Sequence, residues 1–145
     1  MATMRFEELE AWKHARKLVG DIYKITCEDK LARDFGLSSH IQRSAVSTMS
    51  NIAEGFERTG KAEKLNFYNI ARASCGEVRS LLYVIEDNYP DNQDKAIVLR
   101  KDAETVGRLI SGLISSTRRR IITKASMLLI GFLLPITLIA LSPIY

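Results

Sequence analysis

The side chains that could carry out catalysis or bind a metal are few in this sequence and far apart. His14 and His40 have alanine and leucine three positions before them, so neither forms the Glu-x-x-His pair of a metal site in a helical bundle. We interpret Cys27 and Cys75 as reduced thiols, with Cys75 part of the packing. Neither a glycine-rich phosphate loop nor a Ser-His-Asp arrangement stands out. The sequence therefore predicts a protein that is not an enzyme and has no cofactor or metal.

Polar side chains recur on one face of the segment that runs from Arg43 to Arg58. They follow helical steps and are Arg43, Ser47, Ser50 or Asn51, Glu54 and Arg58. One interpretation is a solvated face, with Glu54 and Arg58 paired across one turn. The other is a buried polar network at a helix or subunit interface, where polar groups fix the register. The pattern alone does not choose between the two.

Basic side chains form a second group, which is the basis for a nucleic-acid hypothesis. The candidate contacts are Arg43, Arg58, Lys61, Lys64, Arg72, Arg79, Arg118, Arg119 and Arg120. Within one copy of the chain, glutamates offset part of this charge, and a solvated face explains it. A ring of several copies would multiply the charge, and phosphate binding grows with the number of contacts. We therefore expect salt-sensitive, sequence-tolerant binding of RNA or DNA.

The elements that must position these groups are helices. With 145 residues the chain suits one domain with an appendage, and 8 Gly and 3 Pro are too few for a many-stranded sheet. Apolar residues recur at three- and four-residue steps over about 6–26, 37–56, 61–87 and 91–120. We expect an all-α fold, an antiparallel up-down four-helix bundle over residues 1–120.

The second of these segments is rich in serine and alanine. We expect it to begin near Leu37 or Ser38, because serine is a good N-cap residue. Its small side chains let a neighbouring backbone approach closely. We therefore expect this helix to be central and tightly packed.

An uncharged, mostly apolar run closes the sequence after Lys124. It spans residues 125–145 and predicts an additional apolar helix within a tail of residues 121–145. Such a helix would be about 31 Å long at 1.5 Å per residue, close to the roughly 30 Å of a membrane core. Three interpretations stay open: a membrane anchor, a segment packed on the fourth helix in an oligomer, and the end of a disrupted reading frame.

The net charge of +4 permits an anionic partner without demanding one. No basic-then-apolar signal peptide opens the chain, and its two thiols suit a reducing compartment. We expect a cytoplasmic bundle. If the tail is an anchor, the basic residues before it would hold the bundle on the inner face of the cytoplasmic membrane.

Three segments of the chain resemble a known family. They run over 6–26, which includes Trp12, over 37–58 and over 67–87. The most specific piece is Asn51-Ile52-Ala53-Glu54-Gly55. The chain resembles the four-helix-bundle proteins first noticed as products of intervening sequences in bacterial 23S ribosomal RNA genes. The accessory protein of diversity-generating retroelements belongs to the same group.

The resemblance, which covers about residues 5–115, implies a ring homo-oligomer, typically a pentamer, without known catalytic activity. For the retroelement relative it implies binding of nucleic acid and of a reverse transcriptase. The chain departs from the family at His40, where Gln is frequent, at Gln42, where a second Arg is frequent, and at Met49, where Pro is common. The apolar tail is a further departure. The missing arginine weakens an anion site on the second helix.

The residues and the resemblance together predict a non-catalytic, oligomeric helical-bundle protein that serves as a nucleic-acid-binding or scaffolding accessory factor. Its partners would be copies of itself, RNA or DNA, and a protein of unknown identity. The alternative is a membrane-tethered structural or interaction protein with a C-terminal anchor and no nucleic-acid role.

Overall fold

The computed structural model describes the backbone of residues 5–28 and 30–139 and the side chains of residues 5–28 and 30–119. The α-helices of this part are α1 (Glu10–Ile25), α2 (Phe35–Glu57), α3 (Lys61–Asn88) and α4 (Gln93–Ile139). Single 3-10 turns stand at η1 (Phe6–Glu8), η2 (Leu31–Arg33) and η3 (Pro90–Asn92). These residues contain no strand. The predicted all-α class with four helices is confirmed.

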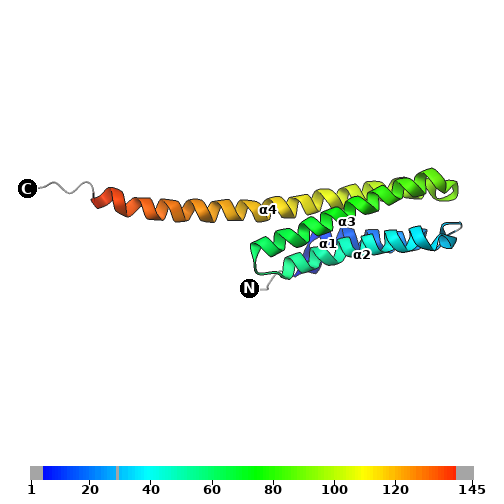
Figure 1. Cartoon of the computed structure of the whole chain (residues 1–145), viewed down its shortest axis with the longest axis horizontal. Helices are drawn as coiled ribbons and strands as arrows, with labels where there is room; N and C mark the ends of the chain where they lie inside the picture. The colour runs from blue at the N-terminus through cyan, green and yellow to red at the C-terminus, as the bar shows by residue number, and fades with distance from the viewer. Residues whose placement is uncertain (1–4, 29, 140–145) are drawn as a thin grey trace, which may run out of the picture.

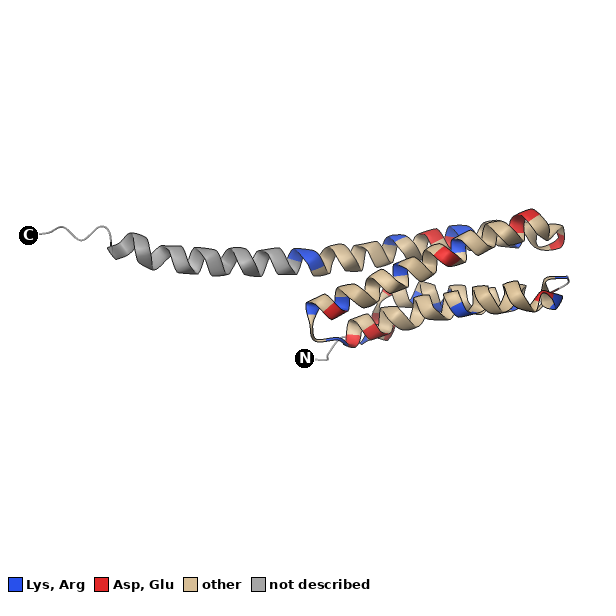
Figure 2. Cartoon of the chain, viewed as in Figure 1, with Lys and Arg blue, Asp and Glu red and all other residues tan. Residues whose placement is uncertain are grey.

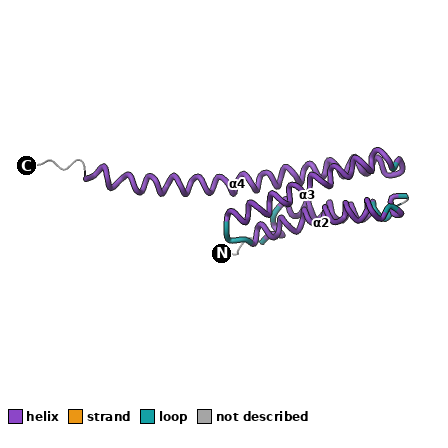
Figure 3. The backbone as a smooth tube through the Cα atoms, in the orientation of Figure 1, coloured by secondary structure: helices purple, strands orange, loops and turns teal. Residues whose placement is uncertain are grey.

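The four helices pack side by side as a bundle. α3 lies against both α2 and α4, and α1 packs against α2 and α4. Figure 1 shows the chain reversing at each connection, with α3 beside α4 and α2 beside α1. The connections are short loops and turns at the ends of the helices, as Figure 3 shows. Each helix therefore turns one apolar face inward.

The core sits where these inward faces meet. Every helix contributes fully buried side chains, such as Leu18, Ile41, Leu82 and Ile110. They recur at three- and four-residue steps, which place them on one side of each helix. Burial of one such side chain contributes about 1.5–3 kcal/mol, so the apolar seams supply most of the driving force for folding.

The start of α2 differs from the sequence prediction. The helix begins at Phe35, and its N-cap is Asp34, whose Oδ1 accepts the backbone N–H of Leu37 at 2.9 Å. Ser38, the predicted cap, lies inside the helix, and its hydroxyl donates to the carbonyl of Leu31 at 3.0 Å. Asp34 also accepts the hydroxyl of Tyr89 at 2.6 Å, and these hydrogen bonds, that of Leu37 first, lower the pKa of its carboxyl.

The end of α4 differs as well. α4 is one continuous helix up to Ile139, so the backbone has no break at residue 120, where we placed the boundary between bundle and tail. The predicted anchor at 125–145 lies outside the residues whose side chains the structure describes. Among the residues whose side chains the structure describes, no helix is both long and apolar enough to cross a membrane.

The tightest contact between α2 and α3 is at Gly55. A Cβ at this position would lie 2.6 Å from Cε1 of Tyr68 and 3.2 Å from Cβ of Phe67. The Tyr68 side chain is buried, and burial raises the pKa of its phenol. The expectation of a tightly packed second helix is correct at this point, because only glycine admits the Tyr68 ring.

We predict that Gly55→Ala lowers the free energy of unfolding by about 1–3 kcal/mol, because the added methyl overpacks the contact with Tyr68. The matched control is Gly20→Ala in α1, where a Cβ would have no neighbour within 4 Å. That change should raise the free energy of unfolding by about 0.5–1 kcal/mol through helix propensity. Urea denaturation measures both, and equal stabilisation by the two changes would contradict the close approach of α2 and α3.

Candidate functional site

A groove of about 480 Å³ lies between α3 and α4 and gathers positive charge. Its lining residues are Arg72, Cys75, Gly76 and Arg79 of α3 with Glu104, Gly107, Arg108 and Ser111 of α4. We call this set the arginine groove. Three arginines face one glutamate, so the hollow carries a net positive charge. Figure 2 marks both basic (blue) and acidic (red) positions on the ribbons of these two helices.

Helical spacing and small side chains together form the groove. Arg72, Gly76 and Arg79 are four and three residues apart, so they share a face of α3. A Cβ on Gly76 would meet nothing within 4 Å, and one on Gly107 would meet only the sulfur of Cys75, at 3.9 Å. The hollow exists because no side chain fills the space between the arginines.

The three arginines of the groove differ in their partners. Arg79 lies 3.7 Å from Glu104 Oε1, and Arg108 donates to the hydroxyl of Thr105 at 2.8 Å. The side chain of Arg72 is exposed and has no ion pair or hydrogen bond with any described residue. The charge of the groove is therefore only partly neutralised within the chain.

The thiol of Cys75 also lines the groove, beside the arginines, and it is a poor nucleophile. Its Sγ donates to the backbone carbonyl of Ala103 at 3.2 Å, which ties α3 to α4. Burial raises the pKa of the Cys75 thiol to about 11, an effect larger than the opposing influence of Arg79. The thiol is protonated at neutral pH, and a protonated thiol is a poor nucleophile.

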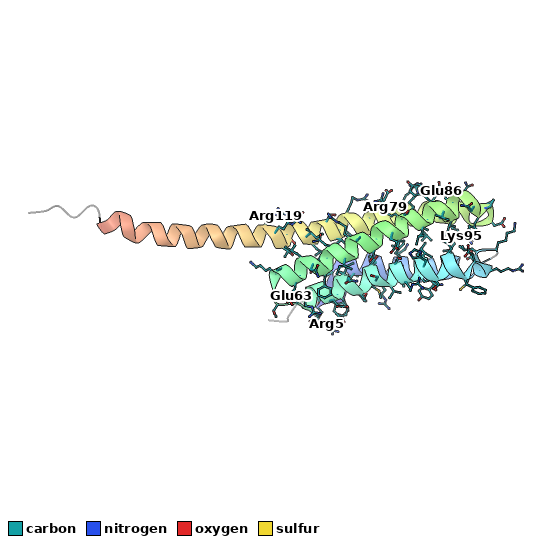
Figure 4. The ribbon with its side chains drawn as sticks, viewed as in Figure 1. Arg5, Glu63, Arg79, Glu86, Lys95 and Arg119 are labelled. Atoms are coloured by element: carbon teal, nitrogen blue, oxygen red, sulfur yellow. The ribbon has the colours of Figure 1, made fainter. Side chains whose placement is uncertain are left out.

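An aromatic side chain adjoins the groove one turn beyond Arg79. The guanidinium carbon of Arg100 lies 4.4 Å from the centroid of the Tyr83 ring, and Nη1 donates to the Tyr83 hydroxyl at 3.1 Å. Arg100 also contacts Glu86 at 3.2 Å and Glu104 at 3.8 Å. In Figure 4, Arg79 and Glu86 lie on the same outer edge of the bundle.

The comparisons with known proteins agree with this architecture. Residues 7–112 match the family model described as 23S rRNA-intervening sequence protein. The chain belongs to this family. The predicted family membership is thus confirmed, and the arginine groove lies within the matched residues. No curated protein matches the chain at the threshold that we applied.

A solved structure from Bacteroides thetaiotaomicron has the same fold. It is described as a protein with unknown function from the S23 ribosomal protein family. The alignment has a TM-score of 0.65 and 20% sequence identity, and it covers 72% of this chain and 95% of that chain. At this identity the likeness concerns the arrangement of the helices.

The Asn-Ile-Ala-Glu-Gly motif has mainly a packing role in this fold. Ile52 is fully buried and Gly55 admits Tyr68, while Ala53 is half-buried. Asn51 donates to the carbonyl of Ser47 at 2.8 Å, within the same helix. Glu54 is exposed and pairs only with Arg58, at 3.6 Å.

Trp12, the other residue singled out as a family position, also packs. Its ring meets Phe6 edge to face with centroids 5.2 Å apart, and Arg16 covers the ring at 5.7 Å. The contact with Phe6 packs η1 against α1.

Both interpretations of the polar stripe on α2 are partly right. In the half-buried middle of the stripe, the hydroxyls of Ser47 and of Ser74 on α3 are 2.9 Å apart, and beside the stripe Ser44 and the exposed His40 each contact Glu77 of α3 at 2.7 Å. The hydrogen bonds of Ser44 and then His40 lower the pKa of the Glu77 carboxyl. On the outer side Arg43 is exposed and bonds only to Ser39. The stripe thus has a polar contact with α3 at its middle and solvated residues at its two ends.

The predicted basic residues divide into two groups. Arg72 and Arg79 lie in the arginine groove, whereas Arg43, Arg58, Lys61 and Lys64 line none of it. Arg58 covers the Phe67 ring at 4.5 Å, and Lys64 donates to the carbonyl of Phe56 at 3.0 Å. Lys61 is half-buried, and it too has a contact within the chain. Arg58 and Lys64 thus stabilise the α2–α3 junction.

The arginines at the end of the described part of α4 lie beyond the groove. Arg118 and Arg119 are exposed, and Figure 4 shows Arg119 projecting from α4. The side chain of Arg120 lies outside the described residues.

Sequence reasoning missed three residues of this region, namely Tyr83, Arg100 and Arg108. A signal was available in the spacing, because Arg100, Glu104 and Arg108 recur every four residues on the outer face of α4. What the spacing does not show is which helix lies beside that face.

We predict that only one of the two cysteines reacts with a thiol reagent such as a disulfide dye in the native chain. Cys27 is exposed and should react promptly, while Cys75 is buried with a raised pKa and should react only after unfolding. Colorimetric thiol counting with and without urea measures this, and Cys27→Ser identifies the reactive thiol. Prompt reaction of both thiols in the native chain would contradict the packing of α3 on α4.

Proposed function

We propose that this protein is a non-catalytic helical-bundle accessory factor that binds nucleic acid through its phosphates and associates with copies of itself. The observation that carries the proposal is the arginine groove, where three arginines and one glutamate line a single hollow. Phosphate oxygens match the planar donor groups of arginine, which bind them in pairs.

The charges within the groove favour an anion over a purely structural role. A half-buried arginine that stabilises a bundle has a carboxylate partner, as Arg100 has in Glu86 and Glu104. Arg72 has no such partner among the described residues, and Arg108 has only a neutral hydroxyl. An arriving phosphate would supply the missing negative charge.

The chemistry of the groove supports binding without catalysis. Its cations attract and orient phosphates, and its only thiol, that of Cys75, is protonated at neutral pH. Glu104 is engaged by Arg79 and Arg100, which compete for its carboxylate. Such a set holds an anion and offers no activated nucleophile.

The second part of the proposal is that copies of the chain associate with one another. The family resemblance implies a ring, and an up-down bundle exposes long outer faces on which copies can meet. Val46 and Ile70 are exposed apolar side chains on α2 and α3, at 36% and 40% of their full surface. Several grooves in one particle would raise the number of phosphate contacts and hence the affinity.

We predict that the full chain binds a labelled RNA of about 20 nucleotides with an affinity that falls steeply between about 50 and 200 mM salt. The double variant Arg72→Gln, Arg79→Gln should weaken binding at least about tenfold and reduce the slope of log K against log salt by about 1–2. Fluorescence anisotropy measures both quantities.

The matched control for this experiment removes the same charge elsewhere. Lys30 and Arg33 are exposed near η2 and do not line the groove. Lys30→Gln with Arg33→Gln should leave most of the affinity and of the salt slope intact. Equal losses in the two double variants would mean that net charge, and not the groove, drives binding.

We also predict that the full chain is a homo-oligomer, with a mass near five times the 16.3 kDa of one copy if the ring is a pentamer. Size-exclusion chromatography with light scattering at tens of micromolar gives the mass directly. A strictly monomeric chain would refute self-association while leaving the phosphate site of each copy to be tested by anisotropy.

The alternative function is a membrane-tethered structural or interaction protein. The uncharged run at 125–145, which follows Lys124, is the observation that favours it. Carbonate extraction of membranes separates the two proposals, because a spanning helix resists extraction and a peripheral nucleic-acid-binding protein does not.

A further inference from the structure

The arginine groove continues into an aromatic platform. Tyr83 lies four residues after Arg79 and therefore on the same face of α3. Its side chain is 46% exposed, although its ring is in contact with Arg100. One face of the ring thus lies on a guanidinium, and nearly half of the side chain stays open to solvent.

The platform is held in a fixed orientation. Arg100 donates to the Tyr83 hydroxyl at 3.1 Å and is itself held by Glu86 at 3.2 Å. The Arg100 side chain is only 19% exposed, so it is a half-buried support for the ring. A ring that is already oriented loses little conformational entropy when a ligand stacks on it.

The aromatic platform of Tyr83 and the arginine groove are neighbours along the α3 axis. Glu104 joins them, because it lies 3.7 Å from Arg79 and 3.8 Å from Arg100. From Arg72 to Tyr83 the α3 axis advances about 16 Å at 1.5 Å per residue. This length matches about five nucleotides of a stacked strand at 3.4 Å each, and fewer of an extended strand.

Cations followed by an exposed aromatic ring are the combination that binds single strands. Every base has a π-face that stacks on an aromatic side chain, and every nucleotide brings a phosphate. In a duplex both faces of each base are already stacked on neighbouring bases. The Tyr83 ring therefore finds no free base face in a duplex on which to stack. An unpaired strand can place one base on the ring while its phosphates follow the arginines.

We propose that the arginine groove and Tyr83 together form a binding site for single-stranded nucleic acid. Arg72, Arg79 and Arg108 contact backbone phosphates, and the open face of Tyr83 stacks on one base. This proposal rests on the proposed function and adds to it the strandedness of the ligand and the residue that selects it. Glu104 keeps Arg79 and Arg100 aligned between the two parts of the site.

The experiment compares one labelled oligonucleotide of about 12 nucleotides, free and annealed to its complement, by anisotropy with the full chain. The single strand should bind about tenfold more tightly than the duplex. Tyr83→Ala should weaken single-strand binding about tenfold, within the range for loss of one stacked base, and leave duplex binding unchanged. The salt slope should stay the same, because no phosphate contact is removed.

Conservative and matched variants separate stacking from folding. Tyr83→Phe should retain single-strand affinity, since it keeps the ring and loses only the hydroxyl. Tyr83→Leu keeps apolar bulk over Arg100 without an aromatic face, and it should behave like Tyr83→Ala. The control is Tyr23→Ala on α1, because Tyr23 is exposed to 45% and lies outside the groove. This change should not affect binding.

A fluorescent base analogue gives a second measurement of the same contact. A single strand that carries 2-aminopurine should lose fluorescence on binding to the wild-type chain and to Tyr83→Phe, and keep it on binding to Tyr83→Leu. Equal affinity for single strand and duplex, or equal behaviour of Tyr83→Leu and the wild type, overturns this inference and leaves phosphate binding in place. Absence of binding by any oligonucleotide at low salt overturns the proposed function as well.

Discussion

The close packing of α3 between α2 and α4 is the constraint on which the rest of the structure depends. On the α2 side, Gly55 lets the Tyr68 ring approach to within van der Waals contact of a helix backbone. On the α4 side, the Cys75 thiol reaches the carbonyl of Ala103. These contacts, one on each side of α3, set which outward residues of α3 stand beside which residues of its neighbours. The polar contacts of α3 with α2 and with α4 therefore depend on these two packing contacts.

The two edges of α3 have different chemistry as a result. Toward α2 the polar groups are paired with one another, as in the contacts of Ser44 and His40 with Glu77. Toward α4 the cations outnumber the carboxylates, and Arg72 has no partner among the described residues. A helix pair whose polar groups are satisfied stabilises the bundle, whereas unsatisfied surface charge attracts a ligand of opposite sign. This difference is why the proposed site lies between α3 and α4 although the family motif lies on α2.

The Asn51–Gly55 motif and Trp12 therefore inform us about the fold more than about the ligand. Ile52 and Gly55 pack, and Trp12 fastens the first turn through Phe6. Arg72, Arg79 and Tyr83 also lie in a segment that resembles the family, but their side chains are exposed and take no part in the core.

The local pattern of the chain was sufficient for the four helices and for most of the buried faces, because apolar spacing depends only on the helical repeat. It was insufficient wherever the outcome depends on a second helix. Asp34 is the cap of α2, although serine at position 38 is a good cap residue, because Leu31 accepts the Ser38 hydroxyl and Tyr89 reaches Asp34 from 55 residues away.

The polar stripe on α2 could be a network or a solvated face, since residues at four-residue steps give the same sequence pattern in both cases until α3 is placed beside them. Arg108 gained significance only from Arg72 and Arg79 across the groove, and Tyr83 only from Arg100. Periodicity along one chain segment specifies which side chains share a face, and only packing specifies what that face meets.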